Sequence, residues 1–197
     1  MALILQHEKK VVLRITYLGI PFSGKSTLLK TLHGLYTEKE RGELQSGFIN
    51  SDRGLCFDLL DLPICVIPGF STSIQISTLP GFPVRTSSYY QLLRMIDGVS
   101  YVVDSQWDRM EENVRAMAAL QELLLEQKKS LSEIPFVLLY NKREVTQAAP
   151  KSYLEETFNQ RSVVVPSFEV NALDGTGIKE SLQAIIQKVE ARYSQPK

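Results

Sequence analysis

The residues with the clearest chemical meaning lie near the start of the chain, in the segment Gly-Ile-Pro-Phe-Ser-Gly-Lys-Ser at positions 19–26. This segment matches the pattern G-x-x-x-x-G-K-[ST] at every fixed position. Residues 11–18 before it are rich in apolar and β-branched side chains, as in a buried strand, and residues 26–33 after it place leucines on one helix face. A strand, a glycine loop and a helix N-terminus gather backbone N–H groups on one point, with the helix dipole behind them. The sequence therefore predicts a site for phosphate groups.

Each residue of this site has an expected role. Lys25 is predicted to reach the terminal phosphates and to assist catalysis, and the Ser26 hydroxyl is predicted to coordinate Mg²⁺. The alternative is a glycine turn with no ligand. The full set predicted to bind phosphate is Gly19, Ser23, Gly24, Lys25, Ser26, Thr27 and Gly81. The expected ligand is a nucleoside triphosphate with Mg²⁺.

The elements that must position these residues follow from the apolar patterning. Strands are predicted at 11–18, 55–60, 73–78, 98–104, 136–140 and 162–165, and helices at 26–33, 87–95, 110–129, 151–159 and 178–193. Strands that alternate with helices imply right-handed crossovers and parallel pairing. We therefore expect an α/β fold, a single P-loop NTPase domain over residues 1–197, with a doubly wound, mostly parallel six-stranded sheet and one antiparallel edge hairpin. Residues 1–9 are expected to be a flexible N-terminus, and 36–54 a mobile segment beside the phosphates.

Composition narrows the classes of function. The chain has 197 residues, 44% of them hydrophobic, and a formal net charge of zero. Such a balance argues against nucleic acid or an anionic membrane surface as the main partner. We see no signal peptide, no apolar run long enough to insert into a membrane and no lipidation motif. The expected protein is therefore cytoplasmic.

Ligands of open parallel sheets sit beyond the carboxyl ends of the strands, so the residues that follow each predicted strand matter most. The first strand is followed by the phosphate loop, and the third by Leu-Pro-Gly, with Thr78 before it. Asn-Lys-Arg-Glu at 141–144 follows the fifth strand, and Asn-Ala-Leu at 171–173 comes after the sixth. We expect these segments to meet at one edge of the sheet.

These stretches, in this order and spacing, resemble the Ras-like small GTPases over nearly the whole chain. The resemblance implies a guanine-nucleotide site for GTP or GDP with Mg²⁺. Asn141 and Lys142 match the family's N-K-x-D motif, with Glu144 in place of the aspartate that accepts hydrogen bonds from guanine. Residues 171–173 stand where the family has S-A-K, so the Ala172 N–H is expected at the guanine carbonyl. The residues implied to bind guanine are Asn141, Lys142, Glu144, Asn171, Ala172 and Leu173.

The chain looks more specifically like the bacterial MglA-type GTPases in residues 51–60, 78–81, 103–106 and 140–143. Thr78 in place of the usual D-x-x-G aspartate, and Arg53 at the end of the first switch, are marks of that group. The resemblance implies a switch in polarity or motility that is reset by a dimeric MglB-type partner of the roadblock fold. We expect the protein to be monomeric alone.

Two departures from the family bear on catalysis. Gly54 stands where MglA-type proteins have a threonine that completes the Mg²⁺ shell, and Phe82 stands where the family has the glutamine that orients the attacking water. Arg53 is predicted to act as an arginine finger in cis; its alternative is a solvated surface residue. We expect very slow GTP hydrolysis. The competing hypotheses are a pseudo-GTPase that works as a nucleotide-bound scaffold, and a phosphate-loop kinase or ATPase.

Overall fold

The computed structural model describes residues 3–5, 10–49, 55–63, 71–81, 87–160 and 164–194 of the chain. The elements follow in the order β1 (Leu3–Leu5), β2 (Lys10–Gly19), α1 (Lys25–Gly34), β3 (Leu44–Ile49), β4 (Leu55–Leu62), β5 (Ser71–Thr78), α2 (Ser87–Met95), β6 (Gly98–Asp104), η2 (Trp107–Arg109), α3 (Met110–Glu126), η3 (Leu131–Glu133), β7 (Phe136–Asn141), α4 (Lys151–Phe158), β8 (Ser167–Glu169) and α5 (Ile178–Ser194). Of the residues expected to form a flexible N-terminus, 3–5 form β1 and the others lie outside the described residues.

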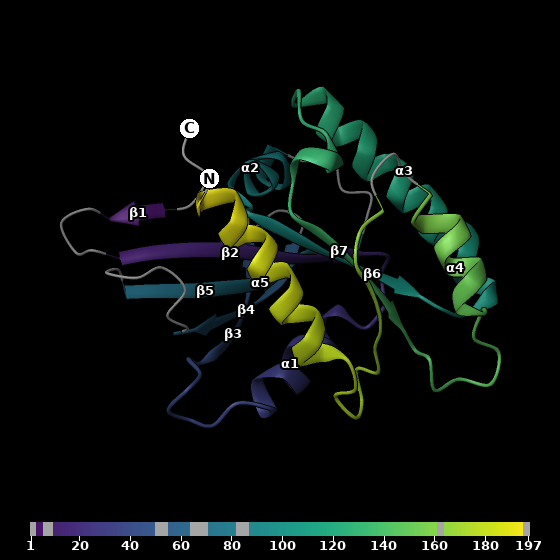
Figure 1. Cartoon of the computed structure of the whole chain (residues 1–197), viewed down its shortest axis with the longest axis horizontal. Coiled ribbons are helices and arrows are strands. Elements are labelled where there is room, and N and C mark those ends of the chain that lie inside the picture. The colour runs from purple at the N-terminus through teal and green to yellow at the C-terminus, as the bar shows by residue number, and fades with distance from the viewer. Residues whose placement is uncertain are drawn as a thin grey trace.

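One mixed sheet carries the whole arrangement, in the strand order β3-β4-β5-β2-β6-β7-β8, with β1 paired to β2 outside this path (Figure 1). Strands β5, β2, β6, β7 and β8 are parallel, whereas β4 is antiparallel to both β5 and β3. Strand β1 pairs antiparallel with the first residues of β2. The α/β class, the mostly parallel sheet and the antiparallel edge are confirmed.

Within the described residues the sheet has eight strands rather than the predicted six, because β1 and β3 were not expected. Strand β3 lies inside the segment 36–54 that was predicted to be mobile, and its residues Gln45, Ser46 and Gly47 give no apolar alternation. It forms because it pairs with β4 along its whole length. Gly47 also leaves room for the Phe57 ring, since a Cβ there would lie 3.0 Å from Phe57 Cζ. Of the predicted last strand at 162–165, residues 162 and 163 lie outside the described residues and 164 and 165 are not in a strand, whereas β8 covers Ser167–Glu169.

Helices cover both faces of the sheet, which confirms the doubly wound prediction (Figure 1). Helices α1 and α5 pack on one face, in a core cluster built around the leucines of α1 and the apolar side of α5. Helices α2, α3 and α4 pack on the other face, around the buried side chains of β6 and β7. Every residue of β6 and β7 is buried, in agreement with sequences that are apolar except for Ser100 and Asp104 in β6 and Asn141 at the end of β7.

Hydrogen bonds between neighbouring strand ends bring the predicted site segments to one edge. The Leu79 N–H donates to the Tyr17 carbonyl (3.3 Å), the Ser105 N–H to the Asn141 carbonyl (3.0 Å) and the Val170 N–H to the Tyr140 carbonyl (2.9 Å). The carboxyl ends of β2, β5, β6, β7 and β8 therefore lie side by side, as expected for a doubly wound sheet.

Candidate nucleotide-binding site

The loop between β2 and α1 has the backbone of an anion-binding turn. Gly19 and Gly24 have φ values of 145° and 96°, conformations that favour glycine. Phe22 also has a positive φ, 62°, although its side chain is 86% exposed. A bulky residue in the left-handed region is strained, and such strain concentrates at functional sites. The loop ends at the N-terminus of α1, where unpaired N–H groups and the helix dipole attract anions.

Lys25 is a buried cation at this helix end, 7% exposed. Its ammonium donates to the carbonyl oxygens of Gly19 (3.1 Å) and Ile20 (2.7 Å). Burial lowers the pKa of Lys25 to about 8, and the nearby Glu112 carboxylate opposes that change. Within the described parts of the chain, no carboxylate makes an ion pair with it. A buried ammonium bonded to carbonyl groups alone is suited to an anion that comes from outside the chain.

Asn141 ties the phosphate loop to the segment at 171–173. Its Nδ2 donates to the Ser23 carbonyl (2.8 Å), and its Oδ1 accepts from the Ala172 N–H (3.1 Å). Gly24 lies against this amide so closely that a Cβ at that position would overlap Asn141 Nδ2. The structure therefore brings together residues predicted to bind phosphate and residues predicted to bind guanine.

The other predicted base-side residues lie around Asn141. Lys142 has a φ of 63°, and its ammonium lies 2.6 Å from Asp104 Oδ2 and donates to Gln106 Oε1 (3.1 Å). The Asn171 side chain accepts from the Leu173 N–H (2.9 Å), which shapes the turn, and Leu173 is 73% exposed. Glu144 is exposed. Lys142 is thus held by the end of β6, while Glu144 and Leu173 face solvent.

Asp58 on β4 belongs to this site although the sequence did not predict it. Thr78 Oγ1 accepts from the Asp58 N–H (2.9 Å) and donates to Asp58 Oδ2 (3.1 Å), and the carboxylate also accepts from Ser46 (2.6 Å) and from Ser26. Burial alone would raise the pKa of Asp58, but these hydrogen bonds outweigh it and hold the pKa below its ordinary value. A carboxylate therefore stands beside Ser26 although Thr78 replaces the D-x-x-G aspartate. A lone acid in a predicted strand was the available signal.

Gly81 lies against the phosphate loop, because a Cβ there would overlap the backbone nitrogen of Pro21. Ser26 is exposed at the start of α1, and Thr27 beside it is partly buried. Arg53, the predicted arginine finger, lies outside the described residues, as do Gly54 and Phe82.

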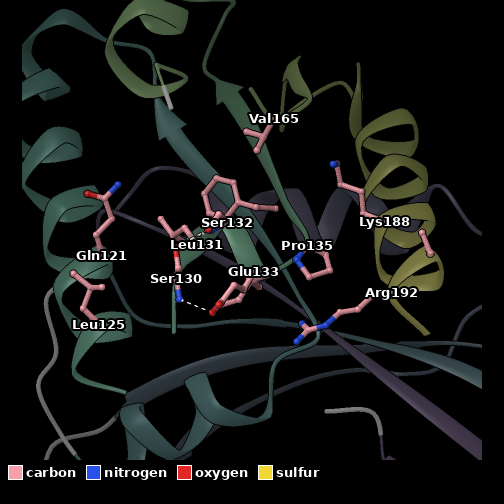
Figure 2. A pocket seen from close by; sticks show the side chains of 13 residues that line it. Gln121, Leu125, Ser130, Leu131, Ser132, Glu133, Pro135, Val165, Lys188 and Arg192 are labelled. Carbon is pink, nitrogen blue, oxygen red and sulfur yellow. Dashed lines mark hydrogen bonds between the residues drawn. The ribbon is translucent and has the colours of Figure 1, made fainter. Parts of the chain in front are cut away.

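A cavity of about 620 Å³ opens at the opposite end of the sheet, between α3, the turn at η3 and α5. Figure 2 shows Gln121 and Leu125 on one wall, Lys188 and Arg192 on another, and Pro135 between them. Its lining includes the start of β7 and none of the predicted nucleotide-binding residues. The residues predicted to bind the nucleotide therefore lie away from this cavity, at the carboxyl ends of the strands. No helix among the described residues is long and apolar enough to span a membrane.

Comparisons with known proteins identify the family of this chain. The model of the ADP-ribosylation factor family matches residues 84–189. The mutual gliding-motility protein MglA of Myxococcus xanthus is 32% identical over 189 residues, which cover 96% of each chain. The GTPase Obg of Listeria welshimeri is 25% identical over 193 residues, which cover 94% of this chain and 42% of Obg. The chain therefore belongs to the Arf/Ras-like small GTPase family.

Proposed function

We propose that this protein is a cytoplasmic guanine-nucleotide switch that binds GTP and GDP with Mg²⁺ and hydrolyses GTP slowly. The buried ammonium of Lys25, at the N-terminus of α1 and bonded to the carbonyls of Gly19 and Ile20, is the observation that carries the proposal. Phosphate oxygens would offset the cost of burying that charge. Lys25 then holds the terminal phosphates and stabilises the charge that develops during transfer.

Base selection is assigned to the loops that meet at Asn141. The bonds of Asn141 to Ser23 and Ala172 support a site in which the base lies beside the phosphate loop. The turn at residues 171–173 would lie beside the carbonyl oxygen of guanine, with the Ala172 N–H nearest to it. Glu144 offers a carboxylate to the guanine N–H groups, one methylene further from the backbone than an aspartate would be. Lys142 anchors the loop that follows β7 through its contacts with Asp104 and Gln106.

The donor set fits a magnesium ion. Mg²⁺ prefers oxygen ligands and retains several waters. Ser26 presents its hydroxyl at the start of α1, and Asp58 accepts hydrogen bonds from Ser26 and Thr78. Ser26 would hold the ion, and Asp58 would orient Ser26 and add negative charge near it. When bound, the ion neutralises charge on the phosphates.

Slow turnover is expected from residues of both switches. Phe82 cannot orient a water molecule, because its side chain neither donates nor accepts a hydrogen bond. Arg53 would stabilise the transferring phosphoryl group, a separate contribution worth about 10³–10⁵ in rate where it operates. Phe82 and Gly54 also favour the second candidate, a pseudo-GTPase that stays in one nucleotide state and acts as a scaffold.

The similarity to a mutual gliding-motility protein supports a role in polarity or motility regulation. In this proposal the protein is monomeric alone, and a dimeric MglB-type partner of the roadblock fold resets its nucleotide state. Nucleic acid is not expected as a partner, consistent with the zero net charge.

Single-turnover hydrolysis of GTP by the purified protein tests this function. The wild type should convert bound GTP to GDP slowly, whereas Lys25→Ala should no longer retain GTP. Lys151→Ala, an exposed lysine at the start of α4, is the matched control and should behave as the wild type. Bound GTP that persists unhydrolysed would replace the switch with the scaffold, and GTP retention by Lys25→Ala would overturn the site assignment.

A further inference from the structure

Arg109 reaches the phosphate loop from a distant part of the chain. It ends η2, directly before α3, and its Nη2 donates to the Pro21 carbonyl (3.0 Å) across 88 positions of sequence. The side chain is 29% exposed, so this hydrogen bond is partly shielded from water. A charged donor makes it one of the stronger hydrogen bonds available to a backbone carbonyl.

The position of Arg109 is fixed on two sides. Its guanidinium is paired with Glu112 one turn later (2.7 Å). The Arg109 carbonyl accepts a hydrogen bond from the buried side-chain amide of Asn113 (2.8 Å). The same amide donates to the Asp104 carbonyl at the end of β6 (2.9 Å) and accepts from the Asp104 N–H (3.2 Å). Asp104 in turn lies beside the Lys142 ammonium. Arg109 is therefore held by the strand that also supports the base-side loop.

The carbonyl that Arg109 binds belongs to the peptide that joins Pro21 to Phe22. In a trans peptide the C=O and N–H point in opposite directions, so fixing the carbonyl also fixes the direction of the Phe22 N–H. Phe22 has the strained φ of 62°, and residues in such conformations persist where surrounding contacts over-determine them. Pro21 has no N–H, so its carbonyl is the one backbone hydrogen-bonding group that can anchor this residue. Gly81 packs against its other side.

We propose that Arg109 is a positioning residue of the phosphate loop: by holding the Pro21–Phe22 peptide it keeps residues 19–24 in the strained form that accepts nucleotide phosphates. This inference rests on the proposed function. Arg109 acts through the loop and not on the reacting atoms. Its loss should loosen the loop and let bound nucleotide leave faster, while the helices and the sheet remain folded.

The test is the release rate of fluorescently labelled GDP at pH 7 with Mg²⁺, chased by excess unlabelled GDP. Arg109→Ala should release GDP about tenfold faster than the wild type, as loss of a charge-assisted hydrogen bond predicts. Arg109→Lys, which retains one charged donor, should lie between them. Arg115→Ala removes an arginine that is paired with Glu111 on the exposed side of α3, so it should stay within twofold of the wild type.

A double-mutant cycle separates this role from a general loss of stability. Phe22→Gly removes the strain, because glycine adopts a positive φ at no steric cost. In the Phe22→Gly background, Arg109→Ala should accelerate release by less than about threefold. The same tenfold acceleration in both backgrounds would overturn the inference, as would release by Arg109→Ala within twofold of the wild type. A wild type that retains no GDP would overturn the proposed function and this inference with it.

Discussion

Raising the pH from 7 to 8.5 should weaken nucleotide binding through Lys25. Its pKa is lowered to about 8 by burial in the nucleotide-free protein, so the ammonium begins to lose its proton within this range. Phosphate oxygens beside Lys25 favour the charged form and raise its pKa in the complex. Binding above pH 8 is therefore coupled to proton uptake, and affinity falls as pH rises.

The size of the effect follows from the charged fraction of Lys25. With a pKa of about 8, this fraction is about 0.9 at pH 7 and about 0.24 at pH 8.5. If the complex requires the ammonium form, the Kd for GDP should rise about fourfold over this interval. The interval ends before guanine itself loses much of its N1 proton, so the protein dominates the change.

Isothermal titration of GDP at several pH values, in buffers of different ionisation enthalpy, measures both Kd and the proton uptake. Glu112→Gln should move the weakening to lower pH, because the Glu112 carboxylate raises the pKa of Lys25. Glu111→Gln, an exposed neighbour paired with Arg115, is the control and should leave the profile unchanged. A Kd that is constant within twofold from pH 7 to 8.5, without proton uptake, would refute the assignment of Lys25 to the phosphates.

Three substitutions test other parts of the site. The rate of GDP release in excess EDTA, divided by the rate with Mg²⁺, measures how strongly the ion holds the nucleotide. Asp58→Asn should lower this ratio by about 10–100-fold, because an outer-sphere carboxylate is lost. An unchanged ratio would exclude Asp58 from the metal site. Gly24→Ala should abolish measurable GDP binding in a titration, since a Cβ overlaps the Asn141 amide and the φ of 96° is strained; normal binding would contradict the described loop. Asn113→Ala should lower the free energy of unfolding by about 3 kcal/mol in urea titrations, because buried backbone groups of Asp104 and Arg109 lose their hydrogen-bond partner. The control Val114→Ala, at an exposed position, should change it by less than about 0.5 kcal/mol. Equal effects of these last two would contradict the role of Asn113.

Patterns within the sequence were sufficient for the parallel half of the fold. Strands β6 and β7 are mainly apolar and buried on both faces, and helix α3 between them has regular apolar spacing, so local sequence and tertiary environment agree. Strand β3 could not be found in this way, because Gln45, Ser46 and Gly47 are polar or small and the strand depends on pairing with β4. Strand β1 has three residues, too few for a period to be read.

The site divides in the same manner. Lys25 and Asn141 were predictable because a short motif fixes their local geometry and their place at a strand end. Asp58 was not, because its contact with Ser26 and Thr78 depends on the register between β4 and β5. Arg109 was not, because its contact with Pro21 joins residues 88 positions apart and no local pattern marks it.

In the proposed function, the loops joined by Asn141 form a site for guanine nucleotides. Titration of the nucleotide-free protein with GDP and with ADP, each with Mg²⁺, tests it most directly. A site that hydrogen-bonds the base edge should bind GDP at least about 100-fold more tightly than ADP, since ADP leaves those groups unpaired. Equal affinities, or tighter binding of ADP, would contradict the account.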